Sequence, residues 1–206
     1  MRRILIPAIV LIFAASAAGG HDISSEAKVT LPFGKGTELD QVERVLQGNA
    51  LELASGEQIR LIGVGVPDQD DPEKNAKNAE RLGIPIKKFE KFSKKSRDFL
   101  KHLVRKNDVY LTLDDTNAAV HHRDELGRKM VYAYGLERKK EYVQFSTALQ
   151  PRYYEEREKN RYHLHVNATM IQAGYAFVEM KYPFRSLELF RKLEREAKEN
   201  KRGIWK

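Results

Sequence analysis

The sequence predicts an α+β fold, a small β-barrel of five strands with about three helices. Short apolar stretches that alternate with polar residues, separated by turn-forming residues, recur through the first two thirds of the chain. Two longer stretches, one near the middle and one at the C-terminus, repeat apolar residues every three or four positions, as amphipathic helices do. The 206 residues give room for one domain around a single core.

Three strands joined by tight turns open the predicted barrel. Their alternating apolar residues are Val42 and Val45, then Leu51 and Leu53, then Ile59, Leu61 and Val64. Turns are expected at Gly48-Asn49 and at residues 55–57, where small and polar residues interrupt the alternation. A curled meander of this kind is a common start for a small barrel.

A helix and two further strands follow. Residues 67–85 are polar and contain proline, so we expect a loop there. The helix after it has one apolar face and lysines on the other, and ends near Asn107-Asp108. Its apolar positions are Phe89, Phe92, Phe99, Leu100, Leu103 and Val104. Residues 109–113 form the fourth predicted strand, and the fifth, after a turn at Gly127, contains Val131 and Ala133.

The C-terminal third is expected to supply the remaining helices. Residues 136–165 are polar and rich in Tyr and Arg, and they fit either a long hairpin or an inserted lobe. A short helix over residues 166–173 should end at Gly174. Ser186 is the expected cap of a last helix that ends at Gly203, and Trp205 should pin the tail to the core. This order of elements is that of a five-stranded OB-type barrel.

The N-terminus has the pattern of an export signal. Arg2 and Arg3 precede an apolar run, and small residues follow it. The run is shorter than the roughly 20 residues that a membrane span needs. We therefore expect a signal peptide at residues 1–18, a linker at 19–38 and the folded domain at 39–206. The protein is expected to be secreted or extracytoplasmic (periplasmic), and membrane-anchored if the signal is uncleaved.

The composition of the chain indicates which classes of partner suit it. Hydrophobic residues make up 41% of the chain and charged residues 32%, which is ordinary for a globular protein. Without cysteine the chain has neither disulfides nor a lipid-modified cysteine anchor. The net charge is +8, and +6 without residues 1–18. A basic domain suits nucleic acid or another polyanion as its partner, and we expect a monomer.

Five segments carry a specific resemblance. VERVLQGNALEL, IRLIGVGVPD, DELGRKMVYAYG, VNATMIQAGYAFV and LEREAKENKRGIW occur in this order. They resemble the signature blocks of the staphylococcal nuclease (thermonuclease) family, which include D-G-D-T, R-L-x-G-I-D-x-P-E and D-x-x-G-R. The resemblance covers about residues 40–206 and leaves 136–165 as an apparent insertion. It implies an OB-type barrel and calcium-dependent hydrolysis of phosphodiesters in DNA and RNA.

The resemblance also implies site residues. Arg60 and Arg128 stand at the family's phosphate-binding arginines, and Asp124 at the aspartate of D-x-x-G-R. Arginine suits this role because its planar fork donates two hydrogen bonds to phosphate oxygens. Asp68 replaces the glutamate that orients water, and Tyr182 lies near the base-stacking tyrosines. Taken singly, Arg60 also fits an ion pair at a strand end, and Arg128 a solvated turn residue.

The metal half of the site departs from the family. D-G-D-T reads Gln47-Gly48-Asn49-Ala50, and Gly65 replaces the aspartate of G-I-D-x-P-E. Calcium affinity depends on charged carboxylates, so we assign no metal ligand, and Ca²⁺ is implied by the resemblance only. One alternative is that nearby acids, Asp70, Asp71 or Glu73, rebuild the site. The other is that they belong to a solvated loop capping a helix.

Other candidates lie outside these motifs. His163 and His165 alternate on a predicted strand and, like His121 and His122, fit either a zinc site or ordinary histidines. A cluster of aromatic and basic residues fits either single-strand binding or a solvated lobe. It comprises Tyr142, Arg152, Tyr153, Tyr154, Arg157, Arg161 and Tyr162.

Two functions remain open at this point. In the first, the chain is an extracytoplasmic nuclease in which Arg60 and Arg128 clamp the phosphate and Asp68 positions water, with activity weak or lost. In the second, it is a non-catalytic module that binds nucleic acid, another polyanion or a protein on the same barrel. Fold alone does not decide between them.

Overall fold

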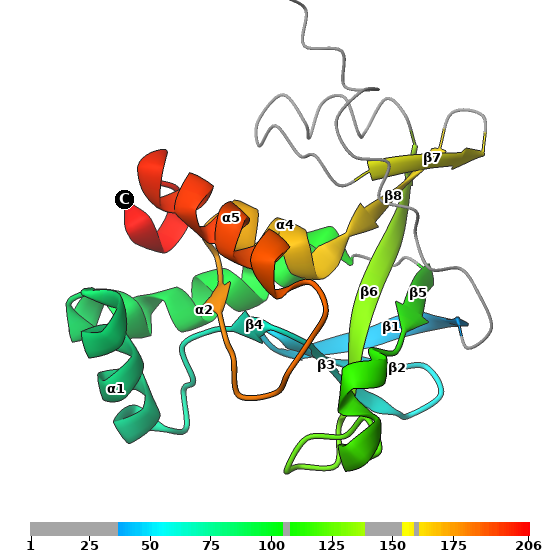
Figure 1. The fold of residues 1–206 in the computed structure, drawn as a ribbon, viewed down its shortest axis with the longest axis horizontal. Helices are drawn as coiled ribbons and strands as arrows, with labels where there is room; N and C mark the ends of the chain where they lie inside the picture. The colour runs from blue at the N-terminus through cyan, green and yellow to red at the C-terminus, as the bar shows by residue number, and fades with distance from the viewer. Residues whose placement is uncertain (1–36, 105–107, 139–153, 159–160) are drawn as a thin grey trace, which may run out of the picture.

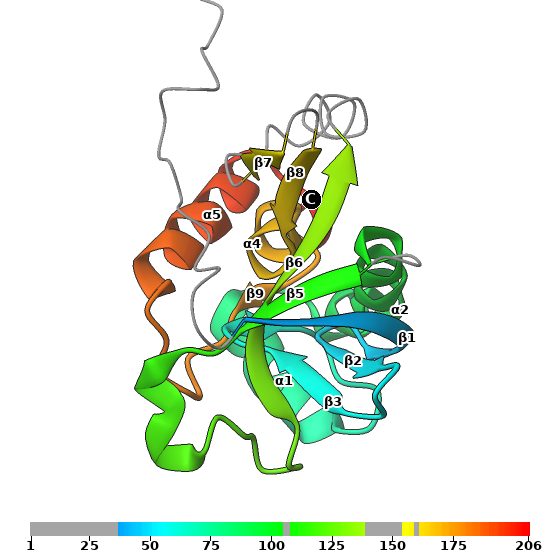
Figure 2. The ribbon, with the colours of Figure 1, turned by 90° about the vertical axis from the view of Figure 1, so that its right-hand side faces the viewer.

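A computed structural model describes residues 37–104, 108–138, 154–158 and 161–206 (Figure 1). Five strands form a closed barrel, as predicted: β1 (Glu38–Gln47), β2 (Ala50–Leu53), β3 (Gln58–Leu61), β5 (Asp108–Thr112) and β6 (Lys129–Arg138). Neighbouring strands pair antiparallel in the order β3-β2-β1-β5-β6, and a parallel pairing of β3 with β6 closes the ring. Figure 2 shows these strands crossing around a common interior.

The long strand β1 makes the closure possible. Its first four residues, Glu38–Gln41, pair with β5, whereas the part from Val42 onward pairs with β2. Two register shifts in the second part bend the strand. Irregularities of this kind increase the local twist, so one strand serves both halves of the barrel.

The chain after the barrel returns as an antiparallel arm. Strand β6 pairs with β8 (Arg161–His165), and β8 pairs with β7 (Tyr154–Glu158). The described parts of the 136–165 segment are therefore paired strands. Residues 139–153 and 159–160 lie outside the described residues. The same holds for the side chains of the predicted Tyr and Arg cluster, at 142, 152–154, 157, 161 and 162.

Four α-helices are described, where the sequence predicted about three. They are α1 (Pro72–Leu82), α2 (Ile86–Leu103), α4 (Val166–Gln172) and α5 (Leu187–Glu199), and in Figure 1 they lie to one side of the barrel. Two 3₁₀ helices accompany them, η1 (Asp115–Val120) and η2 (Gly203–Trp205). Helices α2 and α5 bury the apolar faces predicted for them. No helix in the described part is long and apolar enough to cross a membrane.

Helix α1 corrects the prediction of a loop over residues 67–85. The Asp71 carboxylate caps the helix by accepting a hydrogen bond from the Lys74 N–H at 2.9 Å, and Pro72 fills the first turn. Gly83 ends it in the left-handed conformation, with φ of 66°. Only Asn75 and Ala79 of this helix are buried, so it lacks the apolar periodicity that marks α2.

The last helix ends earlier than predicted. Helix α5 ends at Glu199, and Gly203 lies beyond it in η2. A Cβ atom on Gly203 would lie 2.1 Å from the Gly174 carbonyl oxygen, so only glycine allows this approach. The adjacent Ile204 is buried, and the half-buried Trp205 packs against the same apolar cluster, as predicted. Ser186 precedes α5 as predicted, but its side chain makes no capping hydrogen bond.

A two-stranded ribbon beside the barrel positions the site. Strand β4 (Val64–Gly65) pairs with β9 (Phe177–Val178), so Gly65 lies opposite Phe177. The sequence predicted one strand through residue 64, but Gly63, with φ of 73°, separates β3 from β4. Just after β9, the Glu179 N–H donates to the Gly63 carbonyl at 3.1 Å. This contact brings Glu179 to the end of β3.

Candidate functional site

Asp124 is the buried anchor of the site. It lies on the turn that leads into β6, and its side chain has no exposed surface. Arg128 donates to one carboxylate oxygen from Nε at 2.8 Å and pairs with it from Nη2 at 2.7 Å. Burial alone would raise the pKa of Asp124, but hydrogen bonds from Arg128 outweigh it and hold the pKa below its usual value. Asp124 is therefore ionised at neutral pH.

Arg60, on β3, lies between two carboxylates. Its Nη1 is 3.4 Å from Asp124 Oδ2, and its Nη2 donates to Glu179 in a short ion pair. Burial lowers the pKa of the Arg60 guanidinium, but the carboxylates of Glu179 and Asp124 outweigh burial. The pKa is therefore above its usual value, and the group stays charged. Only 4% of the residue is exposed. The sequence-based reading of Arg60 as an ion-paired residue at a strand thus describes its contacts here.

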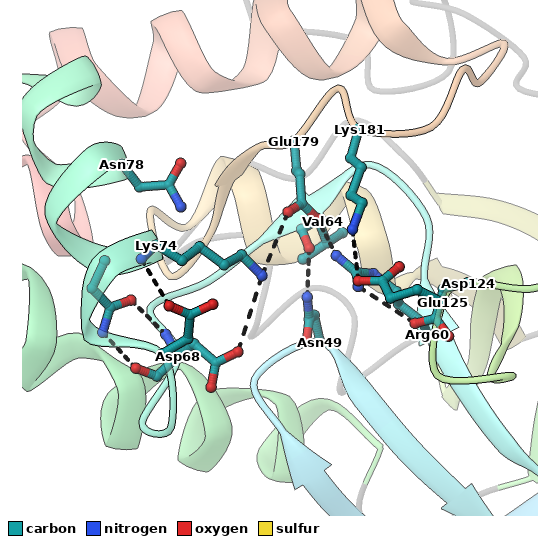
Figure 3. Close-up of polar contacts among 12 residues, drawn as sticks. Asn49, Arg60, Val64, Asp68, Lys74, Asn78, Asp124, Glu125, Glu179 and Lys181 are labelled. Atoms are coloured by element: carbon teal, nitrogen blue, oxygen red, sulfur yellow. Dashed lines mark hydrogen bonds and ion pairs between the residues drawn. The ribbon is translucent and has the colours of Figure 1, made fainter.

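Lys74 and Asp68 extend this arrangement toward solvent. The Lys74 side chain runs from α1 until its ammonium lies between two carboxylates, 3.9 Å from Glu179 and 4.0 Å from Asp68 (Figure 3). Asn75, also on α1, fixes the backbone of Asp68: its amide oxygen accepts from the Asp68 N–H at 2.8 Å, and its amide nitrogen donates to the Asp68 carbonyl. Helix α1 therefore supplies the lysine and holds its partner.

Six side chains thus form a row of alternating charge, which we call the charge row. In order they are Asp68, Lys74, Glu179, Arg60, Asp124 and Arg128. Exposure of the side chains is lowest at Asp124, at 0%, and highest at Lys74, at 36%. Three positive and three negative groups cancel, so each desolvated charge has a neighbour of opposite sign.

The position of the family's calcium does not fit a calcium ion in this chain. A Cβ atom on Gly65 would lie 2.2 Å from the ring of Phe177, so the ring fills the space that an aspartate would need. Asn49 is buried and its amide donates to the Val64 carbonyl at 2.8 Å. At one end of the charge row, the Lys74 ammonium lies between the Asp68 and Glu179 carboxylates. The described residues hold no group of three or more potential ligands among His, Cys, Asp and Glu.

Of the three acids proposed to rebuild a metal site, one caps a helix and two are exposed. Asp71 caps α1, and Glu73 is exposed in the first turn of that helix. Asp70 is exposed, and its N–H donates to the Asp68 carboxylate at 3.1 Å. These contacts match the alternative in which the acidic residues cap a helix beside a solvated loop.

Tyr182 lies in the loop after β9 and joins a second polar cluster. Its hydroxyl forms a short hydrogen bond with the Glu125 carboxylate, which also pairs with Lys181 at 2.7 Å. Burial raises the pKa of Glu125, but these two partners outweigh it and lower the pKa to about 2. Tyr182 is half-buried and holds this loop against the turn that carries Asp124.

The four histidines singled out in the sequence do not come together as a site in the described structure. His163 and His165 lie on β8 and are 1% and 2% exposed. The His163 ring contacts the ring of Tyr110. The His165 ring contacts the rings of Tyr132, Tyr134 and Phe190. His121 and His122 occupy left-handed positions in the turn after η1. His163 and His165 are therefore buried, where the alternative to a zinc site was exposed or hydrogen-bonded histidines.

Sequence reasoning missed Lys74 and Glu179. Lys74 lies in the stretch that was taken for a loop, and a correct assignment of α1 would have placed it on a helix six residues after Asp68. Glu179 follows the VNATMIQAGYAFV segment directly, but 119 residues separate it from Arg60. No local pattern connects residues so far apart in the chain.

Comparison with known proteins identifies the family of the chain. A search of curated proteins returned no match for this chain. A family model described as staphylococcal nuclease homologue matches residues 58–206, which include β3, the turn carrying Asp124 and both C-terminal helices. The match spans more than half of the chain, and the closed five-stranded barrel is the fold expected of the family. The chain therefore belongs to the family of staphylococcal nuclease homologues.

Proposed function

We propose that this protein binds nucleic acid and that its hydrolysis of phosphodiesters is weak or lost. The observation that carries the proposal is the charge row. Its three cations are matched by three carboxylates within the chain, and the Lys74 ammonium lies between the carboxylates of Asp68 and Glu179. No group in the row is left to hold calcium.

The chemistry of hydrolysis explains why this matters. Phosphodiester cleavage needs a cation to stabilise charge on the phosphate and a base to orient water. In this chain the Arg60 guanidinium is turned to Glu179 and Asp124, and the Asp68 carboxylate lies near the Lys74 ammonium. A substrate would have to displace these internal partners before any group could act on it. We therefore expect this protein to bind nucleic acid but to hydrolyse it weakly or not at all.

Helix α2 supports polyanion binding away from the charge row. It carries seven Lys or Arg residues and two acidic residues, a net charge of +5 against +8 for the whole chain. Its exposed lysines recur at helical spacing, so several share a face: Lys87, Lys91, Lys94, Lys95 and Lys101. A basic face of this kind attracts a phosphate backbone without reading its sequence.

Fluorescence anisotropy with a labelled single-stranded DNA tests the proposal. We expect binding that is equal in calcium and in chelator and that weakens as salt rises. Replacing Lys91, Lys94 and Lys95 by Gln should reduce the slope of log K against log salt by about 2, because each lost contact to a single strand contributes about 0.7.

A matched variant controls for net charge. Lys192, Arg195 and Lys201 are exposed elsewhere, and replacing them by Gln makes the same change in charge. Equal weakening by both triple variants would contradict a role for α2, and absence of binding at low salt would contradict the proposal as a whole. Unlabelled heparin as competitor distinguishes a preference for nucleic acid from binding to any polyanion.

We further infer that residues 1–18 direct export, supported by the arginine pair, the apolar run and the small residues after it. Sequencing the N-terminus of the protein from its own cells tests this. A mature chain that begins near residue 19 is the expected result, and a cytoplasmic chain that begins at Met1 would contradict it.

A further inference from the structure

We propose that Glu179 is an internal anion that occupies the phosphate position on Arg60 and, together with Lys74, closes the site. The proposal does not depend on nucleic-acid binding, because inorganic phosphate alone is the ligand in its test. It assigns a role to two residues that the family's signature blocks did not single out.

The geometry of the Glu179 carboxylate resembles that of a bound anion. One oxygen pairs with Arg60 Nη2, and the other lies 3.9 Å from the Lys74 ammonium (Figure 3). A phosphate group between a guanidinium and an ammonium would present its oxygens in the same way. Because the side chain is only 16% exposed, a free anion reaches Arg60 only by displacing it.

The backbone holds Glu179 in this place. Its N–H donates to the Gly63 carbonyl at 3.1 Å, and the preceding residue, Val178, donates to the Glu194 carboxylate at 2.9 Å. The first contact lies at the end of the β4–β9 ribbon, and the second joins the ribbon to α5. Because Glu179 is held beside Arg60 within the same chain, its effective concentration there is high. It therefore competes effectively with dissolved phosphate.

Loss of the Glu179 charge has a definite consequence. Of the charge row, three cations and only the two carboxylates of Asp68 and Asp124 would remain, leaving one net positive charge beside Arg60 and Lys74. Asp124 would still pair with both arginines, so the buried end of the row would keep its partner. The site would then have an unfilled position for an anion.

The test compares Glu179→Gln with the unchanged full chain, because Gln keeps the shape and an acceptor for Arg60. Calorimetric titration with inorganic phosphate at pH 7 and low salt should show at least about tenfold tighter binding for the variant, a modest gain for one freed charge-assisted contact. Glu188→Gln, which removes an 80% exposed acid from α5, is the matched control and should gain nothing. Adding Arg60→Gln to the Glu179→Gln variant should abolish the gain.

Three results would overturn the proposal. One is a folded Glu179→Gln protein with unchanged phosphate affinity, and the second is an equal gain in Glu188→Gln. The third needs no variant: shifts of the Arg60 side-chain NMR signals that saturate when phosphate is added to the unchanged protein. Circular dichroism checks folding, and Glu179→Ala, which removes the same carboxylate, is titrated in parallel.

Discussion

Asp124 and Glu179 show how single carboxylates decide what an arginine can do. Arg60 and Arg128 stand in motifs that resemble the family's phosphate-binding blocks, and both pair with Asp124. A buried guanidinium with a buried partner contributes to folding, and its removal leaves an uncompensated charge. Substitutions in the charge row will therefore change stability as well as binding, and each needs a folding control.

The first prediction concerns Asp124. Replacing it by Asn leaves two buried guanidiniums without their shared carboxylate, which should lower the free energy of unfolding by about 3 kcal/mol. Urea denaturation measures this directly. Asp115→Asn, in the neighbouring η1 where the side chain is 91% exposed, should leave the midpoint unchanged. A loss well below about 1 kcal/mol for Asp124→Asn would contradict the proposed anchor role.

The second prediction concerns His165. Burial among aromatic rings lowers its pKa to about 3, far below the 6.5 expected in the unfolded chain. The unfolded state therefore takes up a proton first, so stability is full above pH 6.5 and is lost as pH falls toward 3. The loss amounts to about 2 kcal/mol at pH 5, and His165→Gln should remove this part of the pH dependence.

Chemical denaturation at pH 7 and pH 5 measures this difference. His102→Gln serves as the control, because His102 is exposed on α2. An identical drop in stability between the two pH values in the unchanged protein and in His165→Gln would show that other groups cause the acid sensitivity.

Among the elements, α1 and the β4–β9 ribbon determine the surroundings of Asp68 and Gly65. Helix α1 fixes Asp68 through Asn75 and inserts Lys74 into the charge row. The ribbon places the Phe177 ring against Gly65, and that ring packs on Phe89 of α2 at 5.7 Å between centroids. The space for a metal-binding aspartate has become part of an apolar cluster.

The third prediction follows from this packing. Gly65→Ala should destabilise the protein by about 1–3 kcal/mol, because its Cβ would overlap the Phe177 ring and force it to move. Gly135→Ala on β6 is the matched control, since the nearest atom to its Cβ lies at 3.8 Å. Thermal unfolding of the two variants gives the comparison, and equal midpoints would show that the ring yields without cost.

At the scale of the whole molecule, the sequence predicts the barrel well and the site only in part. Alternating strands and turns are local signals, so the barrel strands, α2 and α5 could be found. The ordered motifs singled out Arg60 and Asp68, which lie in the charge row, and the substitutions at Asn49 and Gly65. The charge row depends on contacts such as Arg60–Glu179, across 119 residues, which only the closed barrel brings together. Helix α1 escaped notice because it buries little apolar surface.

Cleavage of single-stranded DNA by the full chain tests directly whether the protein binds DNA without hydrolysing it. The reaction is followed in calcium and in chelator, at protein concentrations that saturate binding. The account predicts that the DNA is bound in both conditions and that calcium adds no cleavage, because the Lys74 ammonium lies between the Asp68 and Glu179 carboxylates and the Phe177 ring leaves no room for a carboxylate at position 65. Calcium-dependent cleavage that is abolished by chelator and by Asp68→Ala would contradict it.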